Sequence, residues 1–262
     1  MIMCVLAVLT NFATVQSEKQ VVPDKRPEVA SLIQEFERHV EKRGSEDPAA
    51  IANVAQLSTE FSKSGPKDKA GIVSTLAKAI ESPRAQPKKG EYDDALALAA
   101  AKALGPMAPE SVSPLTDALG QKETRHDLAL QRQLLLALGR TREKDAVKPL
   151  TQNLVNPEFS LVAAAAEALG EFEGAKLELR REIFSALIKP LMSAKNAMDD
   201  NANSATQAGG GADSTYARRY DAIAAPIMGA LHRISKHEET DPILWERWWN
   251  KNKNGDWDAK KP

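Results

Sequence analysis

The sequence predicts an all-α fold, and three observations support this prediction. Alanine and leucine are abundant in the chain of 262 residues, and both are strong helix formers. Apolar residues recur at the spacing of one helix face, and segments with this spacing repeat along the chain. No segment of the sequence alternates β-branched residues as a half-buried strand would. We therefore expect helices throughout and no sheet.

One apolar pattern occurs four times. An apolar residue stands at positions i, i+4, i+7 and i+8, which form a single stripe along a helix. The four copies begin at Leu96, Leu130, Leu161 and Ile223. Three of them are followed directly by a glycine: Gly105, Gly139 and Gly170. A glycine after a helix typically supplies the positive φ that ends it, so we predict a helix end at each of the three.

A second type of helix alternates with the first and has valine, leucine and leucine at i, i+3 and i+7. The clearest copies start at Val112 and Val147, with Val73, Leu76 and Ile80 keeping the spacing. Ile188, Pro190 and Leu191 keep only its first part. The repeat length is about 31 to 34 residues, which fits a pair of helices.

Several helix starts are marked by a short polar residue followed by proline. Asn156-Pro157-Glu158, Asp47-Pro48 and Asp241-Pro242 have this form. The side chain of Asn or Asp can accept hydrogen bonds from the first-turn amides, and proline fits where no N–H is needed. We therefore expect helices to begin at these three places.

These repeats resemble a known family. The residues that support the resemblance are Ala137 to Arg140, Asp145 to Leu150, Asn156 to Glu158 and Ala163 to Gly170. Together they are similar to HEAT repeats, and most similar to the short PBS-lyase HEAT-like subtype, over roughly residues 45–235. The resemblance implies an α-solenoid of antiparallel helix pairs, with one set of helices lining a concave surface. Each pair cannot bury its apolar stripe alone, so neighbouring pairs must stack.

The amino terminus is predicted to be a signal peptide over residues 1–17. This stretch has no charged side chain, and its apolar run from Ile2 to Leu9 is shorter than the ~20 residues that span a bilayer. Val15 and Ser17 suit the positions before a cleavage site. No Lys or Arg precedes the run, so a buried first helix or a wrongly placed start codon stays an alternative. We expect a periplasmic or secreted protein, and a cytoplasmic one if the signal interpretation is wrong.

The remaining chain divides by pattern into three parts. Residues 18–44 form an N-terminal segment with one helix, residues 45–235 hold the repeats, and residues 236–262 form a Trp-rich capping helix and tail. Residues 195–215, rich in Asn, Ala, Ser and Gly, are predicted to be a flexible surface loop, or alternatively a partner-binding or lid loop. Residues 82–91 are a smaller insertion of the same kind.

All four tryptophans lie in the last eighteen residues. Trp245, Trp248 and Trp249 stand at i, i+3 and i+4 and share one face of a helix. Their main interpretation is a cap over the apolar edge of the last repeat. The alternative is an aromatic platform for a glycan or a peptide. The helix also resembles the C-terminal helix of secreted bacterial HEAT-repeat proteins of unassigned role.

Composition and motifs argue against several kinds of chemistry. With 35 basic and 36 acidic residues the net charge is −1, so the chain lacks the basic excess that nucleic-acid binding requires. A single cysteine excludes a disulfide framework. Residues 250–261 have the spacing of a calcium loop but end on Lys261 where a bidentate glutamate is needed. We find no glycine-rich phosphate loop and no nucleophile motif, so we predict no enzyme activity, no metal and no cofactor.

The sequence therefore predicts an extracytoplasmic, non-catalytic scaffold that binds a protein partner on its concave face, and no insertion into the membrane after signal cleavage. Candidate residues of that face are Lys102, Gln131, Arg132 and Glu167, whose mixed charges suit a protein better than a polyanion. One alternative is an accessory enzyme like the bilin lyases that contain this repeat subtype. A second alternative is glycan or peptide binding through Trp245, Trp248 and Trp249.

Overall fold

The computed structural model describes residues 22–42, 44–81, 95–208 and 213–259, and in these ranges it contains helices and no strand. The all-α prediction is confirmed. The α-helices are α1 (Pro27–Glu41), α2 (Asp47–Phe61), α3 (Pro66–Glu81), α4 (Ala95–Leu104), α5 (Val112–Gly120), α6 (Leu128–Thr141), α7 (Lys144–Gln152), α8 (Phe159–Leu169), α9 (Leu177–Ala208), α10 (Ser214–Ser235) and α11 (Pro242–Asn252). The predicted signal peptide at residues 1–17 and the insertion at residues 82–91 lie outside the described residues.

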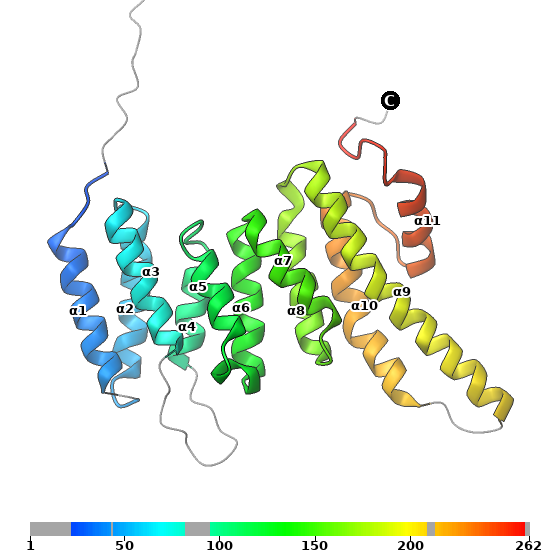
Figure 1. Cartoon of the computed structure of the whole chain (residues 1–262), viewed down its shortest axis with the longest axis horizontal. Coiled ribbons are helices and arrows are strands. Elements are labelled where there is room, and N and C mark those ends of the chain that lie inside the picture. Colours follow the sequence, from blue (N-terminus) through cyan, green and yellow to red (C-terminus); the bar gives the residue numbers. More distant parts are fainter. Residues whose placement is uncertain (1–21, 43, 82–94, 209–212, 260–262) are drawn as a thin grey trace, which may run out of the picture.

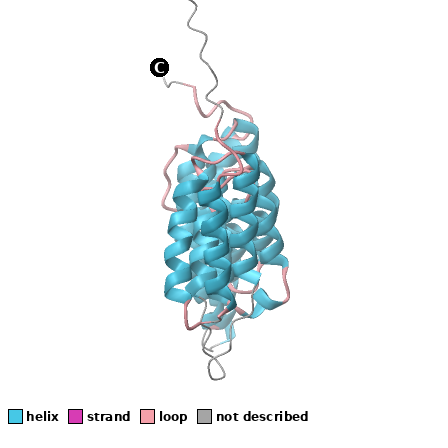
Figure 2. Cartoon of the chain, turned by 90° about the vertical axis from the view of Figure 1, so that its left-hand side faces the viewer, coloured by secondary structure: helices cyan, strands magenta, loops and turns pink. Residues whose placement is uncertain are grey.

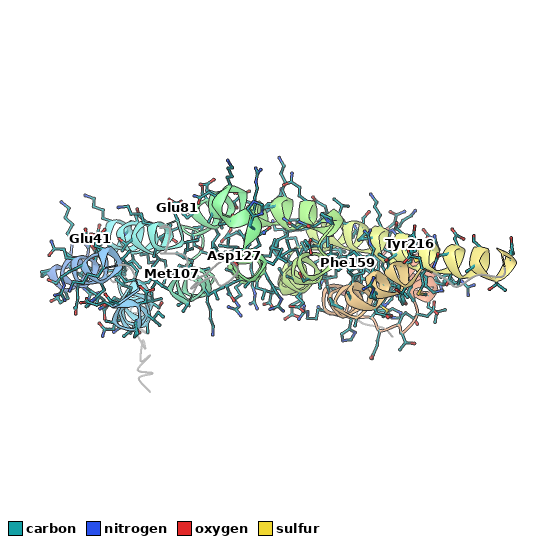
Figure 3. The ribbon with its side chains drawn as sticks, turned by 90° about the horizontal axis from the view of Figure 1, so that it is seen from below. Glu41, Glu81, Met107, Asp127, Phe159 and Tyr216 are labelled. Atoms are coloured by element: carbon teal, nitrogen blue, oxygen red, sulfur yellow. The ribbon has the colours of Figure 1, made fainter. Side chains whose placement is uncertain are left out.

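The helices are arranged in two rows that run the length of the molecule (Figure 1). Helices α2, α4, α6, α8 and α10 contact one another in sequence and form the even-numbered row, whereas α1, α3, α5, α7 and α9 form the odd-numbered row. Figure 3 looks along the helices and separates the two rows. Seen from the α1 end, successive helices overlap in a narrow stack (Figure 2). The last helix, α11, packs on α9.

The repeated apolar stripes form the core between the rows. In α6 the residues Leu134, Ala137 and Leu138 are all 0% exposed, and the corresponding residues of α4, α8 and α10 are buried apart from the half-buried Ala103. Full burial of one leucine side chain stabilises a fold by about 1.5–3 kcal/mol relative to exposure. The predicted periodicity of these four helices is therefore confirmed.

Two of the three predicted helix ends are confirmed, because α4 ends at Leu104 and α8 at Leu169, directly before Gly105 and Gly170, but the predicted mechanism is wrong. None of them has a positive φ, and Gly139 lies inside α6, which ends at Thr141 with Arg142 in the left-handed conformation. Gly139 permits close approach between neighbouring helices, whereas Gly170 leaves room for a side chain of α10. A Cβ at Gly139 would lie 2.6 Å from the Cα of Ala168, and a Cβ at Gly170 would lie 2.2 Å from the Arg233 guanidinium. Sequence spacing alone does not distinguish a glycine that permits contact from one that permits φ > 0.

Of the three predicted helix starts, one is capped as expected. The Asp241 carboxylate accepts hydrogen bonds from the backbone N–H groups of Ile243 and Leu244, with Pro242 in the first turn. Asn156 instead accepts from the N–H of Glu158, one residue before α8 begins. Asp47 is already the first residue of α2, and its carboxylate accepts from the N–H of Gly44.

The prediction of a flexible loop at residues 195–215 is wrong for most of this segment. Helix α9 continues to Ala208, and α10 begins at Ser214. Lys195 and Asp199 form an ion pair at i and i+4, and the Asn201 amide hydrogen-bonds to the backbone of Asp213 across the two helices. Alanine, lysine, glutamine and methionine favour a helix, which outweighs the asparagines in this stretch. The far end of the α9–α10 hairpin extends beyond α8 (Figure 1).

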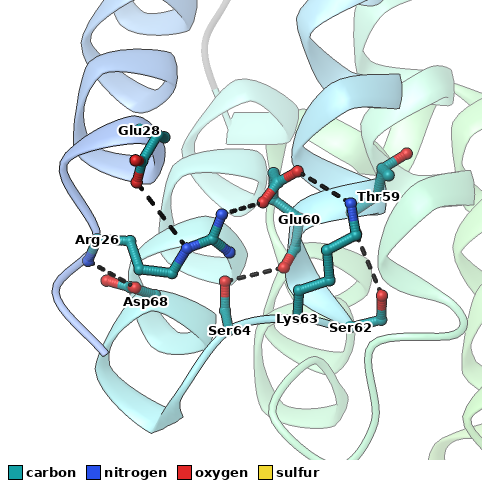
Figure 4. A network of polar contacts seen from close by, with 8 residues as sticks. All are labelled: Arg26, Glu28, Thr59, Glu60, Ser62, Lys63, Ser64 and Asp68. Carbon is teal, nitrogen blue, oxygen red and sulfur yellow. Dashed lines mark hydrogen bonds and ion pairs between the residues drawn. The ribbon is translucent and has the colours of Figure 1, made fainter. Parts of the chain in front are cut away.

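A polar network fixes the chain that leads into α1 (Figure 4). The Arg26 backbone N–H donates to the Asp68 carboxylate at 3.0 Å, while the Arg26 guanidinium binds Glu60 at 2.5 Å. The hydrogen bond from Arg26 holds the pKa of Glu60 below its ordinary value. The Asp24 carboxylate accepts from the backbone N–H of Asp68 at 3.0 Å, in the first turn of α3. The segment before α1 is therefore tied to α2 and α3.

Replacing Gly139 by alanine tests the close approach of α6 and α8. Because the added methyl would meet the Ala168 backbone, we expect the substitution to lower the free energy of unfolding by about 1–3 kcal/mol. Gly229→Ala is the control, since Gly229 is exposed inside α10 and a Cβ there meets nothing within 4 Å. That change is expected to raise stability by about 0.5–1 kcal/mol. Denaturant unfolding of both variants measures the effects, and equal effects at the two sites would contradict the packing described.

Candidate interaction surfaces

The predicted surface residues lie on three adjacent helices of the even-numbered row. Lys102 is exposed on α4, Gln131 and Arg132 lie on α6, and Glu167 lies on α8. The structure brings two of them together, because the guanidinium of Arg132 lies 3.3 Å from the Glu167 carboxylate. Gln131 donates from its side-chain amide to the carbonyl of Arg125, so it stabilises the turn before α6. Of the four, Arg132 and Glu167 are thus neighbours across α6 and α8, and Lys102 lies on the adjacent helix α4.

A second set of charged residues continues this face from α6 to α10. Arg233 on α10 donates to the backbone carbonyl of Glu167 at 2.9 Å, and Arg142 pairs with Glu171 at 3.1 Å. Arg140, Glu171 and Arg233 line a shallow groove of about 190 Å³ between the helices. Sequence reasoning missed these residues, because their proximity depends on how far α8 and α10 are shifted relative to α6.

These ion pairs contribute little to folding. The side chains of Arg132 and Glu167 are 50% and 41% exposed, and exposed ion pairs typically contribute only about 0.2–1 kcal/mol. Charges of both signs at exposed positions can instead pair with complementary charges of a partner.

An aromatic cluster centred on Phe184 of α9 holds α11 against the rest of the molecule. The ring of Trp249 stacks on Phe184 with centroids 4.7 Å apart, and Trp245 meets it edge-on at 5.9 Å. Trp248 and Trp257 also lie beside Phe184, at 5.4 and 5.7 Å. Trp245 is 0% exposed, so no part of its ring can contact a ligand at the surface. The prediction that Trp245 binds a glycan or a peptide is therefore wrong.

The C-terminal tail is fastened to the same place by a buried arginine. Arg180 on α9 is 2% exposed and binds the Asp258 carboxylate at 2.8 Å, with its guanidinium above the ring of Trp257. Lys236 binds the other oxygen of Asp258, also at 2.8 Å. Hydrogen bonds from Lys236 and Arg180 lower the pKa of Asp258 even though burial acts to raise it. Residues 253–259 therefore fold back over α9 and α11.

The part of the chain that the structure describes holds no group of three or more His, Cys, Asp or Glu side chains arranged to bind a metal. Among the same residues, no helix is both long and apolar enough to cross a membrane. No protein-family model matches the chain, and no curated protein matches it. The HEAT-like resemblance and the function inferred from it therefore stay predictions.

The ion pair at Asp258 predicts how stability depends on pH. Its pKa in the folded protein lies below the ordinary 3.8, so the stabilisation is present above that value and is lost as the pH falls through the folded pKa. Asp258→Asn should therefore be less stable than the parent by roughly 1 kcal/mol near neutral pH. The difference should shrink as the pH falls below the ordinary pKa of 3.8 and vanish once Asp258 is protonated in the folded protein.

Urea unfolding followed by tryptophan fluorescence, repeated from neutral pH to below the ordinary pKa of 3.8, measures this difference. Asp256→Asn is the matched control, because among the described residues Asp256 accepts from the backbone N–H of Asp258 and forms no ion pair. A difference between Asp258→Asn and the parent that stays constant with pH would contradict the ion pair.

Proposed function

We propose that this protein is a non-catalytic scaffold, built as an α-solenoid of HEAT-like helix pairs, that binds another protein along its even-numbered row. The observation that carries the proposal is the continuous face of α4, α6 and α8 with exposed charges of both signs. The two rows of neighbouring helices and the repeat pattern over roughly residues 45–235 support the solenoid part of the proposal.

The even-numbered row is the proposed concave side. Both rows bow slightly in the same direction when viewed along the helices, and the even-numbered row lies on the inside of this arc (Figure 3). A partner seated there would contact several helices at once, so affinity would come from many modest contacts rather than from a pocket. Lys102 and Arg132 offer cations to that partner, and Glu167 offers a carboxylate.

The partner is proposed to be a protein because the charge balance opposes a polyanion. The chain carries a net charge of −1 and has no excess of basic residues. Binding to nucleic acid relies on an excess of basic residues that neutralises phosphates. A mixed-charge face is better suited to a protein surface with charges of both signs.

Charge reversal on the proposed binding face tests this function. The double variant Lys102→Glu/Arg132→Glu should lose a partner that the parent protein captures from a native extract, with affinity reduced at least tenfold. Lys144→Glu/Lys148→Glu is the control, because both lysines are exposed on α7 in the odd-numbered row. Affinity capture followed by mass spectrometry compares the three proteins. Capture of the same proteins by all three would count against the proposed face.

The proposed location outside the cytoplasm has a separate test. If residues 1–17 are a signal peptide, the mature protein isolated from its native source should begin at Glu18. N-terminal sequencing measures this directly. An intact Met1 in the purified protein would contradict the proposed location and leave the cytoplasmic alternative.

A further inference from the structure

A groove of about 620 Å³ lies between the end of α10, α11 and the C-terminal tail. The residues that define it are His237, Leu244, Arg247, Trp248, Lys251 and Trp257. Four of these are on α11 at positions i, i+3, i+4 and i+7, so they line one side of that helix. The proposed function does not use this groove.

The aromatic floor of the groove is held in place by the fold. The His237 ring stacks on Trp248 with centroids 4.9 Å apart and planes 11° apart, and its Nε2 lies 2.9 Å from the Glu239 carboxylate. The Trp257 indole donates to the backbone carbonyl of Asn252 at 2.9 Å. A floor that is already ordered loses little conformational entropy when a ligand binds.

The charges around the groove favour an anionic ligand. Arg247 and Lys251 are exposed on α11 and form no ion pair within the described chain. Of the two carboxylates in the lining, Glu239 pairs with His237, and Asp256 accepts from the N–H of Asp258 and keeps its charge. The free cations Arg247 and Lys251 outnumber the one lining carboxylate that forms no ion pair among the described residues. The two free cations are therefore available to carboxylates of a ligand.

The rim of the groove is aliphatic as well as basic. Leu244 is 39% exposed beside Trp248, and the neighbouring Ile243 is 42% exposed. An aliphatic side chain of a peptide can pack on Leu244 and the indole edge, whereas a sugar ring gains from flat aromatic faces and not from leucine. Exposed leucine next to two free cations therefore matches a peptide that alternates apolar and acidic residues.

We propose that this groove binds an acidic segment of a partner protein, with its carboxylates on Arg247 and Lys251 and an aliphatic side chain against Leu244 and Trp248. This site is separate from the face of α4, α6 and α8 and can act whether or not that face binds a partner. It gives the C-terminal helix a recognition role in addition to its packing on α9.

Fluorescence anisotropy of the full chain with a fluorescein-labelled peptide of Glu, Leu and Ser tests the proposal. We expect saturable binding, at least tenfold weaker binding to Arg247→Glu/Lys251→Glu, and weaker binding to Leu244→Ser. Lys144→Glu/Lys148→Glu on α7 and Lys102→Glu/Arg132→Glu on the even-numbered face should bind the peptide as the parent does. The second of these controls separates this site from the proposed binding face.

Three outcomes would overturn the proposal. Equal binding of a peptide with Lys in place of Glu would show that charge is not recognised. Unchanged affinity in Arg247→Glu/Lys251→Glu would place the peptide elsewhere. Stronger competition by polygalacturonate than by unlabelled peptide would assign the groove to an acidic polysaccharide.

Discussion

The close contact between α6 and α8 is the packing constraint on which the two rows depend. At Gly139 there is room for a hydrogen atom and not for a methyl group, because the Ala168 backbone would lie 2.6 Å from a Cβ. Alanines and leucines elsewhere in the even-numbered row keep the neighbouring helices similarly close. Small side chains at these contacts let short helices bury continuous stripes, which explains why aromatic residues make up only 5% of the chain.

An array built this way has ends that its repeating contacts do not cover. At the C-terminal end, Phe184 on α9 would be left exposed without α11, and the tryptophans cover it with large rings. The same large rings leave a basic, partly apolar groove on the outer side of α11. On the exposed side of α4, α6 and α8 lie Lys102, Arg132 and Glu167. The packing requirement thus accounts for both surfaces that we propose to be functional.

The sequence was sufficient to predict the features that depend on local periodicity. The four apolar stripes, the absence of strands from the described residues and the shared face of Trp245 and Trp249 follow from spacing along the chain. The helical extent of residues 195–208 does not follow from composition, because asparagine and serine, which disfavour a helix, are interleaved there with alanine, which favours it. The composition of a segment does not show which side chains meet on a helix. Lys195 and Asp199 stand at i and i+4, and their ion pair favours the helix in this segment.

Features that depend on contacts between distant residues could not be predicted. Arg180 and Asp258 are 78 residues apart in the chain, and nothing in either neighbourhood of the sequence indicates that they meet. The role of Gly139 requires knowing that Ala168 lies opposite it, and the burial of Trp245 requires the position of Phe184. Arg140 and Arg233 became candidates for the binding face only once α6, α8 and α10 were placed side by side.

We infer that the helices form an array held by contacts between neighbours and closed at one end by the aromatic cluster of α11. Hydrogen exchange measured on the chain lacking residues 241–262 tests this inference most directly. Each helix contacts mainly its neighbours, so loss of α11 should reduce protection in α9 and α10 while α1, α2 and α3 keep the protection of the full chain. Uniform loss of protection along the chain would contradict an array held by neighbouring contacts. Unchanged protection in α9 and α10 would contradict the role of α11 as a cap.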